Sequence, residues 1–282
     1  MTKKILPYLQ YLLPQRGLSR LAGMIASSQT IWLKNLLIKQ FIRRYQIDLS
    51  AAQFQKISDY ASFHDFFTRA LKPEYRPIAD DPEVICSPVD GRVSQFGQIH
   101  HASVLQAKGI NYSLDALLPG GTELYRPFVD GQFITLYLSP ADYHRVHMPV
   151  AGTLVRADYV PGQLFAVNEA SVHTIKGLFS RNERLVCYFD TELGKMALIM
   201  VGALLVAGIK TVWTSQQQIA LPKHPLSFAK GEEIGHFTFG STVILLFDRQ
   251  ARISWELFLQ RELQLQFGQE MAQFHSTSQV SG

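Results

Sequence analysis

Three short segments of the chain carry the residue types that could do chemistry. Asp90 precedes a glycine, His144 and His147 lie three residues apart, and Ser241 follows Gly240. A serine hydroxyl is a poor nucleophile unless a neighbouring base takes its proton, and a carboxylate behind an imidazole fixes the tautomer of that base. The sequence therefore offers an acid, two imidazoles and a hydroxyl from which a nucleophilic site could be built.

Each of these residues also has a structural interpretation. An aspartate before a glycine is typical of a tight turn, and Ser241 could simply begin a strand after a glycine turn. His144 and His147 could be surface residues or metal ligands, because neutral imidazole is a common ligand. The residue types alone leave these alternatives open.

Two other classes of protein fit part of the pattern. A metal-dependent hydrolase could use His100, His101, His144 and His147, but the acidic ligands that such a site normally includes are not suitably spaced, and we expect no metal. A non-catalytic lipid-binding β domain would use the glycine–serine pair only as a turn. Both alternatives predict that the protein remains a single intact chain.

The elements that must position these residues are mostly strands. Short runs rich in Val, Ile, Phe and Tyr, separated by Gly, Pro, Asn and Asp, predict strands at Arg92–Ile99, Phe133–Leu138, Thr153–Val160, Leu185–Phe189 and Thr242–Phe247. The apolar run Met196–Ile209 is shorter than the ~20 residues of a transmembrane helix and contains glycines, which predicts two buried strands. Cys86 and Cys187 are expected as buried thiols of a reducing compartment.

Helices are expected ahead of this β region. Ser50 with Gln53, and Ser62 with Asp65, have the spacing of helix caps, and Pro73 should end the second helix. The fold class is therefore α+β, with a predominantly antiparallel β body, sandwich or barrel-like, preceded by amphipathic N-terminal helices.

The N-terminal segment is basic and apolar. Residues 1–47 contain eight Lys and Arg and no Asp or Glu, although the whole chain has a net charge of only +4. Basic residues interleaved with Leu, Ile and Trp are typical of a helix that lies on an anionic membrane surface, whereas nucleic-acid binding would favour a basic stripe on the folded body. We expect residues 1–47 to associate with a membrane, residues 48–282 to form the catalytic domain, and no secretory signal or nucleic-acid partner.

Six segments together resemble the phosphatidylserine decarboxylases over nearly the whole chain. The segments are Phe66–Arg69 with Arg76–Ile78, Ser87–Gly91, Tyr143–Pro149, Leu164–Asn168, Phe179–Arg184 and Phe239–Thr242. One departure is Phe239, where bacterial members typically have leucine before the glycine–serine pair.

The resemblance implies that the chain cleaves itself between Gly240 and Ser241 into a β chain, residues 1–240, and an α chain, residues 241–282. Ser241 would become a covalent pyruvoyl cofactor, whose ketone reacts with the amino group of phosphatidylserine and accepts electrons as carbon dioxide leaves. Gly240, which has no Cβ, could adopt a strained backbone and admit close attack.

The resemblance also implies roles and partners. His147 would be the general base, Asp90 would orient it and stabilise its charged form, and His144 is the better candidate for returning a proton in the mature enzyme. Arg69, Arg76 and Asn168 are possible lipid-site residues, although structural roles suit them equally. The two chains would stay together as a heterodimer, dimerise further, and bind phosphatidylserine and the anionic surface on the cytoplasmic side of the cell membrane.

Overall fold

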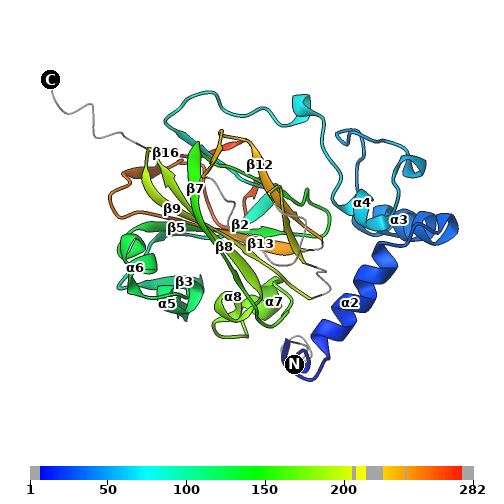
Figure 1. Ribbon diagram of the computed structural model, residues 1–282, viewed down its shortest axis with the longest axis horizontal. Coiled ribbons are helices and arrows are strands. Elements are labelled where there is room, and N and C mark those ends of the chain that lie inside the picture. The colour runs from blue at the N-terminus through cyan, green and yellow to red at the C-terminus, as the bar shows by residue number, and fades with distance from the viewer. Residues whose placement is uncertain (1–6, 205–207, 214–224, 239, 275–282) are drawn as a thin grey trace.

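The computed structural model describes residues 7–204, 208–213, 225–238 and 240–274. Its centre is an antiparallel eight-stranded sheet in the order β11–β7–β8–β9–β13–β5–β2–β15, with the N-terminal helices to one side (Figure 1). The strands are β2 (Gly91–Gln98), β5 (Gln132–Leu138), β7 (Gly152–Val160), β8 (Arg184–Thr191), β9 (Gly194–Val201), β11 (Leu226–Phe228), β13 (Ser241–Phe247) and β15 (Gln264–Leu265).

Smaller sheets complete the β body. They comprise β1 (Val84–Cys86), β16 (Glu270–Phe274) and β14 (Ile253–Trp255) in one sheet, β10 (Ile209–Thr211), β12 (Glu233–Phe237) and β6 (Arg145–His147) in another, and the hairpin β3 (Ser103–Ala107) with β4 (Ile110–Ser113). The expected α+β class with a mainly antiparallel body is confirmed. The large sheet is open, since β11 and β15 form its edges in the described part of the chain, so the body is layered and not a closed barrel.

The large sheet is buried on both faces. Alternation along β13 sends Val243, Leu245 and Phe247 into a core shared with the two three-stranded sheets. Ile244 and Leu246 point into a second core, which short helices and the hairpin cover. These short helices are α5 (Leu114–Leu117), α6 (Thr122–Tyr125), α7 (Glu169–Val172) and α8 (Leu178–Arg181), with a 3₁₀ turn at Arg126–Phe128.

The strand predictions are confirmed to within a few residues at each end. The run Met196–Ile209 contains most of β9 and the first residue of β10 rather than two complete strands, and part of it lies outside the described residues. Cys86 and Cys187 are buried free thiols, as expected.

The N-terminal helices are α2 (Gln15–Ala26) and α3 (Ile31–Tyr45). The 3₁₀ turns at Ile57–Asp59 and Pro73–Tyr75 and the short α4 (Phe63–Phe67) follow them. Ser62 caps α4 as predicted, since its hydroxyl accepts from the Asp65 amide at 3.1 Å. The helix predicted after Ser50 is wrong. The Ser50 amide and hydroxyl both donate to Asp48, at 2.8 and 2.6 Å, and stabilise a turn there.

Candidate active site

His147 is the last residue of β6, and its ring makes two hydrogen bonds and one stacking contact. Its ring Nδ1 lies 2.9 Å from the Gly231 carbonyl oxygen, and its Nε2 lies 3.0 Å from the Tyr143 hydroxyl. The ring stacks on Phe267 with 3.7 Å between centroids. Because a carbonyl can only accept, Nδ1 carries the proton, and the basic lone pair is on Nε2, which accepts from Tyr143.

Burial keeps this imidazole neutral. It lowers the pKa of His147 to about 4, although the Gly231 carbonyl and the charges of Glu233 and Asp90 act in the opposite direction. A neutral ring with a defined tautomer at neutral pH is what a general base requires.

Asp90 lies in the turn before β2 and is bound by two other segments. Arg76 grips its carboxylate with two donors, Nε at 2.9 Å and Nη2 in a shorter contact, and the Phe267 amide donates to Oδ1 at 2.8 Å. The family resemblance implies that Asp90 orients the His147 ring. In the structure the Gly231 carbonyl does so, through its hydrogen bond with Nδ1. Asp90 and His147 are instead linked through Phe267, whose amide binds one and whose ring stacks on the other.

His144 lies just before β6 and is fully buried. Its Nδ1 is 2.8 Å from the Asp142 carbonyl oxygen, and its ring is 4.2 Å from that of Phe67. Nδ1 must therefore be the protonated nitrogen, which leaves the lone pair on Nε2 without a hydrogen-bond partner among the described residues. Burial, and to a lesser degree the charge of Arg69, lowers the pKa of His144 to about 3.

Ser241 begins β13, opposite Leu138 of β5. Its side chain is fully buried, and within the described chain its hydroxyl has no hydrogen-bond partner. Gly240 has no positive φ, and a methyl group at its Cα would meet only the Leu138 carbonyl oxygen, at 3.8 Å. The expected strain at Gly240 is therefore not evident in its φ angle or in crowding around it.

Ser241 and His144 lie on two chain segments that are joined at both ends. Ser241 pairs with Leu138 at one end, and the Phe237 amide donates to the His144 carbonyl at 3.0 Å at the other. Only a few residues of each segment separate these two ties. Within the described residues, both the buried Ser241 hydroxyl and the buried His144 Nε2 lack a hydrogen-bond partner. Buried polar groups are rarely left unpaired, so the pair marks a candidate site.

The three residues considered for the lipid site have different partners in the structure. Arg76 is committed to Asp90, and the Asn168 side chain caps α7 by accepting from the Ser171 amide at 3.0 Å. Arg69 is buried over the ring of Phe66 and donates to the Ala141 carbonyl at 3.2 Å. Its Nε and Nη1 find no partner in the part of the chain that the structure describes.

Three contacts of this site were not predicted from the sequence. Tyr143 is part of the histidine segment, so its position could have suggested a role, whereas Gly231 and Phe267 carry no signal of their own. Nor do the described residues contain a group of three or more His, Cys, Asp and Glu placed to hold a metal ion. The metal-hydrolase alternative therefore has no ligand set in that part of the chain.

Comparison with known proteins gives consistent matches. A family model described as phosphatidylserine decarboxylase matches residues 63–273, and one described as PSD matches residues 5–46. The chain is 52% identical over 255 residues to a phosphatidylserine decarboxylase proenzyme of Alcanivorax borkumensis, covering 86% of this chain and 87% of that one. It is 48% identical over 266 residues to the proenzyme of Acinetobacter baumannii, covering 93% of each chain.

Proposed function

The chain belongs to the phosphatidylserine decarboxylase family, and on that premise we propose that it cleaves itself between Gly240 and Ser241 and then converts phosphatidylserine to phosphatidylethanolamine. One observation carries the proposal for the site. The Ser241 hydroxyl is fully buried and unpaired among the described residues, at the start of a central strand and beside the segment of His144.

In the proposed cleavage the Ser241 Oγ attacks the Gly240 carbonyl carbon. The bond from that carbon to the Ser241 nitrogen breaks, so an ester replaces the amide and the nitrogen takes up a proton. Loss of the Ser241 α-proton then breaks the Cβ–Oγ bond. Residues 1–240 leave with a carboxylate terminus, and the dehydroalanine at position 241 adds water and releases ammonia.

Electrostatics favour His147 as the base for this step. Burial lowers the pKa of both the His144 and the His147 rings. The charges of Glu233 and Asp90 raise the pKa of His147 and that of Arg145 lowers it, whereas the one charge that acts on His144, that of Arg69, lowers its pKa. A protonated imidazole is therefore better stabilised at His147, whose Nε2 lone pair is held by Tyr143. We assign His144 to the mature enzyme, where its unpaired Nε2 could hold the proton that replaces the lost carboxylate.

A pyruvoyl group formed from Ser241 would supply the electron sink for decarboxylation. The residues present fit this group. Position 241 is fully buried at the start of β13, opposite Leu138 of β5, which excludes water, and His144 on the adjoining segment has an unpaired nitrogen among the described residues. Arg69 places a buried cation close enough to affect His144.

The two chains should remain associated after cleavage. β13 belongs to the C-terminal chain but pairs along its length with β5 on one side and β9 on the other. β16 pairs with β1, and β15 with β2, in the same way. Every one of these contacts joins residues before Gly240 to residues after it, so separation would require the body to unfold.

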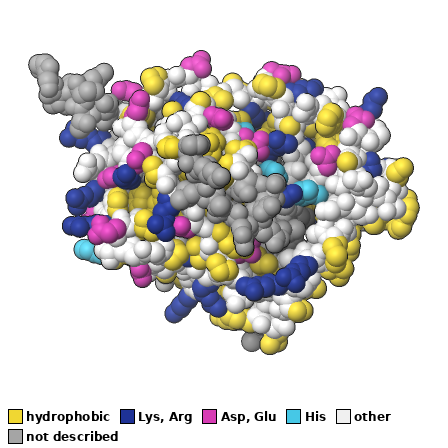
Figure 2. Space-filling view, viewed as in Figure 1, with side chains coloured by type: hydrophobic (Ala, Val, Ile, Leu, Met, Phe, Trp, Pro, Cys, Tyr) yellow, Lys and Arg dark blue, Asp and Glu magenta, His cyan; other side chains and the backbone are white. Residues whose placement is uncertain are grey.

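Membrane association is supported by the way α2 attaches to the body. The buried side chains of α2 are polar: Gln15 and Ser19. Gln15 accepts from the Leu164 amide at 2.7 Å, whereas Leu21 and Met24 are exposed. In Figure 2 hydrophobic side chains gather along the outer edge of these helices, with Lys and Arg beside them. The described residues include no helix that is long and apolar enough to cross a bilayer. We propose peripheral binding on the cytoplasmic side of the cell membrane.

Intact-mass measurement of the purified protein tests the proposal directly. We expect two chains, residues 1–240 and 241–282, with the smaller one blocked to N-terminal sequencing and reactive with ketone-trapping reagents. Ser241→Ala should give one chain of about the full 31.9 kDa and release no carbon dioxide from phosphatidylserine. Ser227→Ala, an exposed serine on β11, should be processed normally. An uncleaved wild-type chain would contradict the proposal.

A further inference from the structure

A large pocket among the described residues lies between the N-terminal helices and the β body. Its volume is about 1650 Å³, above the ~300–1,000 Å³ of sites for drug-sized molecules. One wall comes from α2 and α3, and the other from residues 159–164, 208–210 and Thr238 of the body. Thr238 is three residues before Ser241 in the chain, so one residue of the pocket lining belongs to the segment that leads to the proposed cleavage site.

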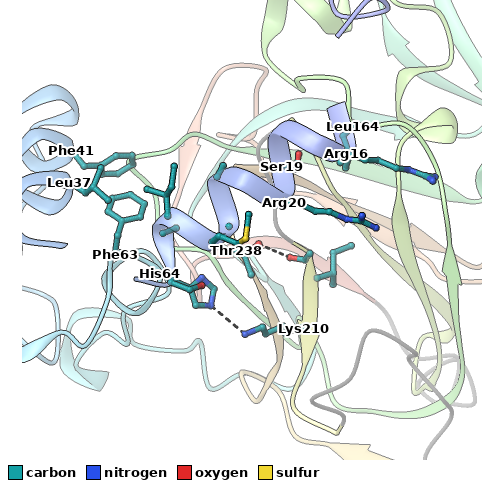
Figure 3. Close-up of a pocket in the computed structure, with 18 of the residues that line it drawn as sticks. Arg16, Ser19, Arg20, Leu37, Phe41, Phe63, His64, Leu164, Lys210 and Thr238 are labelled. Carbon is teal, nitrogen blue, oxygen red and sulfur yellow. Dashed lines mark hydrogen bonds between the residues drawn. The ribbon is translucent and has the colours of Figure 1, made fainter. Parts of the chain in front are cut away.

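The lining divides by chemistry. Figure 3 shows Leu37, Phe41 and Phe63 together on one side of the pocket, while Arg16 and Arg20 project from α2. The large apolar residues of α2 that also line it are Met24 and Ile25, which are exposed to solvent in the chain alone. A cavity with such walls suits an occupant with long apolar chains.

The polar lining is predominantly cationic. Arginines from α2 and α3 line the pocket together with Lys210 of β10, and Glu183 is the single carboxylate among the described lining residues. Within the described chain none of these cations takes part in an ion pair; the arginines are Arg16, Arg20, Arg43 and Arg44. Unpaired cations around an apolar cavity indicate an anionic, amphipathic ligand.

Among these cations, Lys210 lies beside the half-buried, neutral imidazole of His64, whose pKa burial and the charge of Lys210 lower to about 4. The Lys210 Nζ lies 3.5 Å from the His64 Nε2, and the His236 ring lies 6.4 Å from that of His64 (Figure 3). Lys210 is also placed by the body rather than by the helices. It faces His236 across the β10–β12 pair, and β12 leads directly to Thr238.

We propose that Lys210, with His64 beside it, binds the phosphodiester of a glycerophospholipid whose acyl chains lie along the apolar wall formed by α2, α3 and Phe63. The proposal rests on the proposed function for its choice of lipid, because an anionic phosphodiester with two acyl chains is what phosphatidylserine presents. It assigns the phosphate to β10, which pairs with the strand that precedes the cleavage segment, and the acyl chains to the helices. A phosphate fixed at Lys210 would hold the head group at the body while the acyl chains remain at the membrane-facing side.

Binding to the uncleaved Ser241→Ala full-length chain tests this without requiring catalysis. Calorimetry with dioctanoyl phosphatidylserine, below its micelle concentration, should show at least about tenfold weaker binding for Lys210→Gln, because a charged hydrogen bond is lost. Lys108→Gln, at an exposed position outside the pocket, is the matched control and should bind normally. Dioctanoylglycerol, which has no phosphate, should bind equally to all three chains.

Each alternative outcome is distinguishable. Equal lipid affinity in the Lys210→Gln and control chains would overturn the proposal, as would inorganic phosphate binding as tightly as the lipid. In cleaved enzyme, Lys210→Gln should raise KM and leave kcat and self-cleavage unchanged. An unchanged KM with normal carbon dioxide release would refute the phosphate site but not the proposed function. Lys210-dependent lipid binding together with a wild-type chain that never cleaves would refute only the function.

Discussion

The β body and helix α2 bury opposite kinds of side chain, and α3 is intermediate. In β13 every residue from Ser241 to Phe247 is buried, most of them apolar, and the strand is paired on both sides. In α2 the buried residues are Gln15 and Ser19, and in α3 they are Lys34 and Ile38. Burial of apolar surface is the main driving force for folding. The exposed apolar side chains of the N-terminal helices therefore indicate a surface that is buried against a membrane or another molecule.

The two helices are attached to the rest of the chain by different kinds of contact. Gln15 and Gln10 accept from the Leu164 and Ala166 amides, both at 2.7 Å, so α2 and the segment before it are joined to the body by hydrogen bonds. α3 is held more firmly, because Phe41 contacts the aromatic rings of Phe63 and Phe66. The stability of the body should therefore depend on conditions that affect its interior, such as pH. The helices should instead determine binding to a membrane surface.

The largest predicted effect is on the body and concerns pH. Burial lowers the pKa values of His144 and His147 to about 3 and about 4, below their ordinary value near 6.5. Between pH 6.5 and pH 4 the unfolded chain binds protons that the folded chain cannot, so the free energy of unfolding should fall as pH falls, by on the order of several kcal/mol. Urea denaturation of the uncleaved Ser241→Ala chain at several pH values would measure it.

His147→Asn provides the comparison for this slope. It removes one of the two buried imidazoles, so stability should change less steeply between pH 6.5 and pH 4, whatever the variant costs at neutral pH. Residues 1–47 contain no Asp, Glu or His, so the charge of the N-terminal segment should not change over the same range. A free energy of unfolding that is flat across this range would show that the imidazoles are not buried as described.

The sequence predicted the parts of this molecule that depend on local pattern. Alternating apolar residues identified β13, and the Ser62–Asp65 spacing identified the start of α4. The same cap spacing failed at Ser50, because Asp48 competes for its amide and hydroxyl.

The candidate site was predictable as a set of residues and not as a set of contacts. The motifs placed Asp90 and His147 together, but Arg76 and Phe267, which bind Asp90, approach it only in the folded chain. The Gly231 carbonyl that orients His147 is 84 residues away in sequence, and a backbone carbonyl leaves no mark on residue identity. Contacts of this kind depend on the tertiary fold.

A smaller effect is expected where α3 contacts the segment that follows it. Lys34 of α3 is buried, and its Nζ donates to the carbonyls of Ile57, Ser58 and Tyr60, at 3.3, 3.4 and 2.6 Å. Lys34→Met would leave these acceptors unpaired and should lower the free energy of unfolding by about 1–3 kcal/mol. Lys39→Met, on an exposed face of the same helix, should change it by less than about 0.5 kcal/mol. Equal effects in urea denaturation would show that this contact does not secure α3.

The smallest effect on stability is expected at the exposed face of α3. This face also gives the most direct test of the difference between the helices and the β body. Ile31 and Trp32 are 72% and 68% exposed, so replacing both with serine should change the free energy of unfolding by less than about 0.5 kcal/mol. The same variant should bind anionic vesicles at least about tenfold more weakly in sedimentation, because each buried large apolar side chain contributes roughly 1.5–3 kcal/mol.

The matched control for this surface is Leu257, which is fully exposed but lies on the β body. Leu257→Ser removes a comparable apolar side chain from a region that we do not expect to meet the membrane, so vesicle binding should be unchanged. Raising the salt concentration should weaken binding of both variants, since screening acts on the Lys and Arg that they share. If Leu257→Ser reduces binding as much as the α3 variant, apolar exposure on the helices has no special role, and the membrane contact extends over the body.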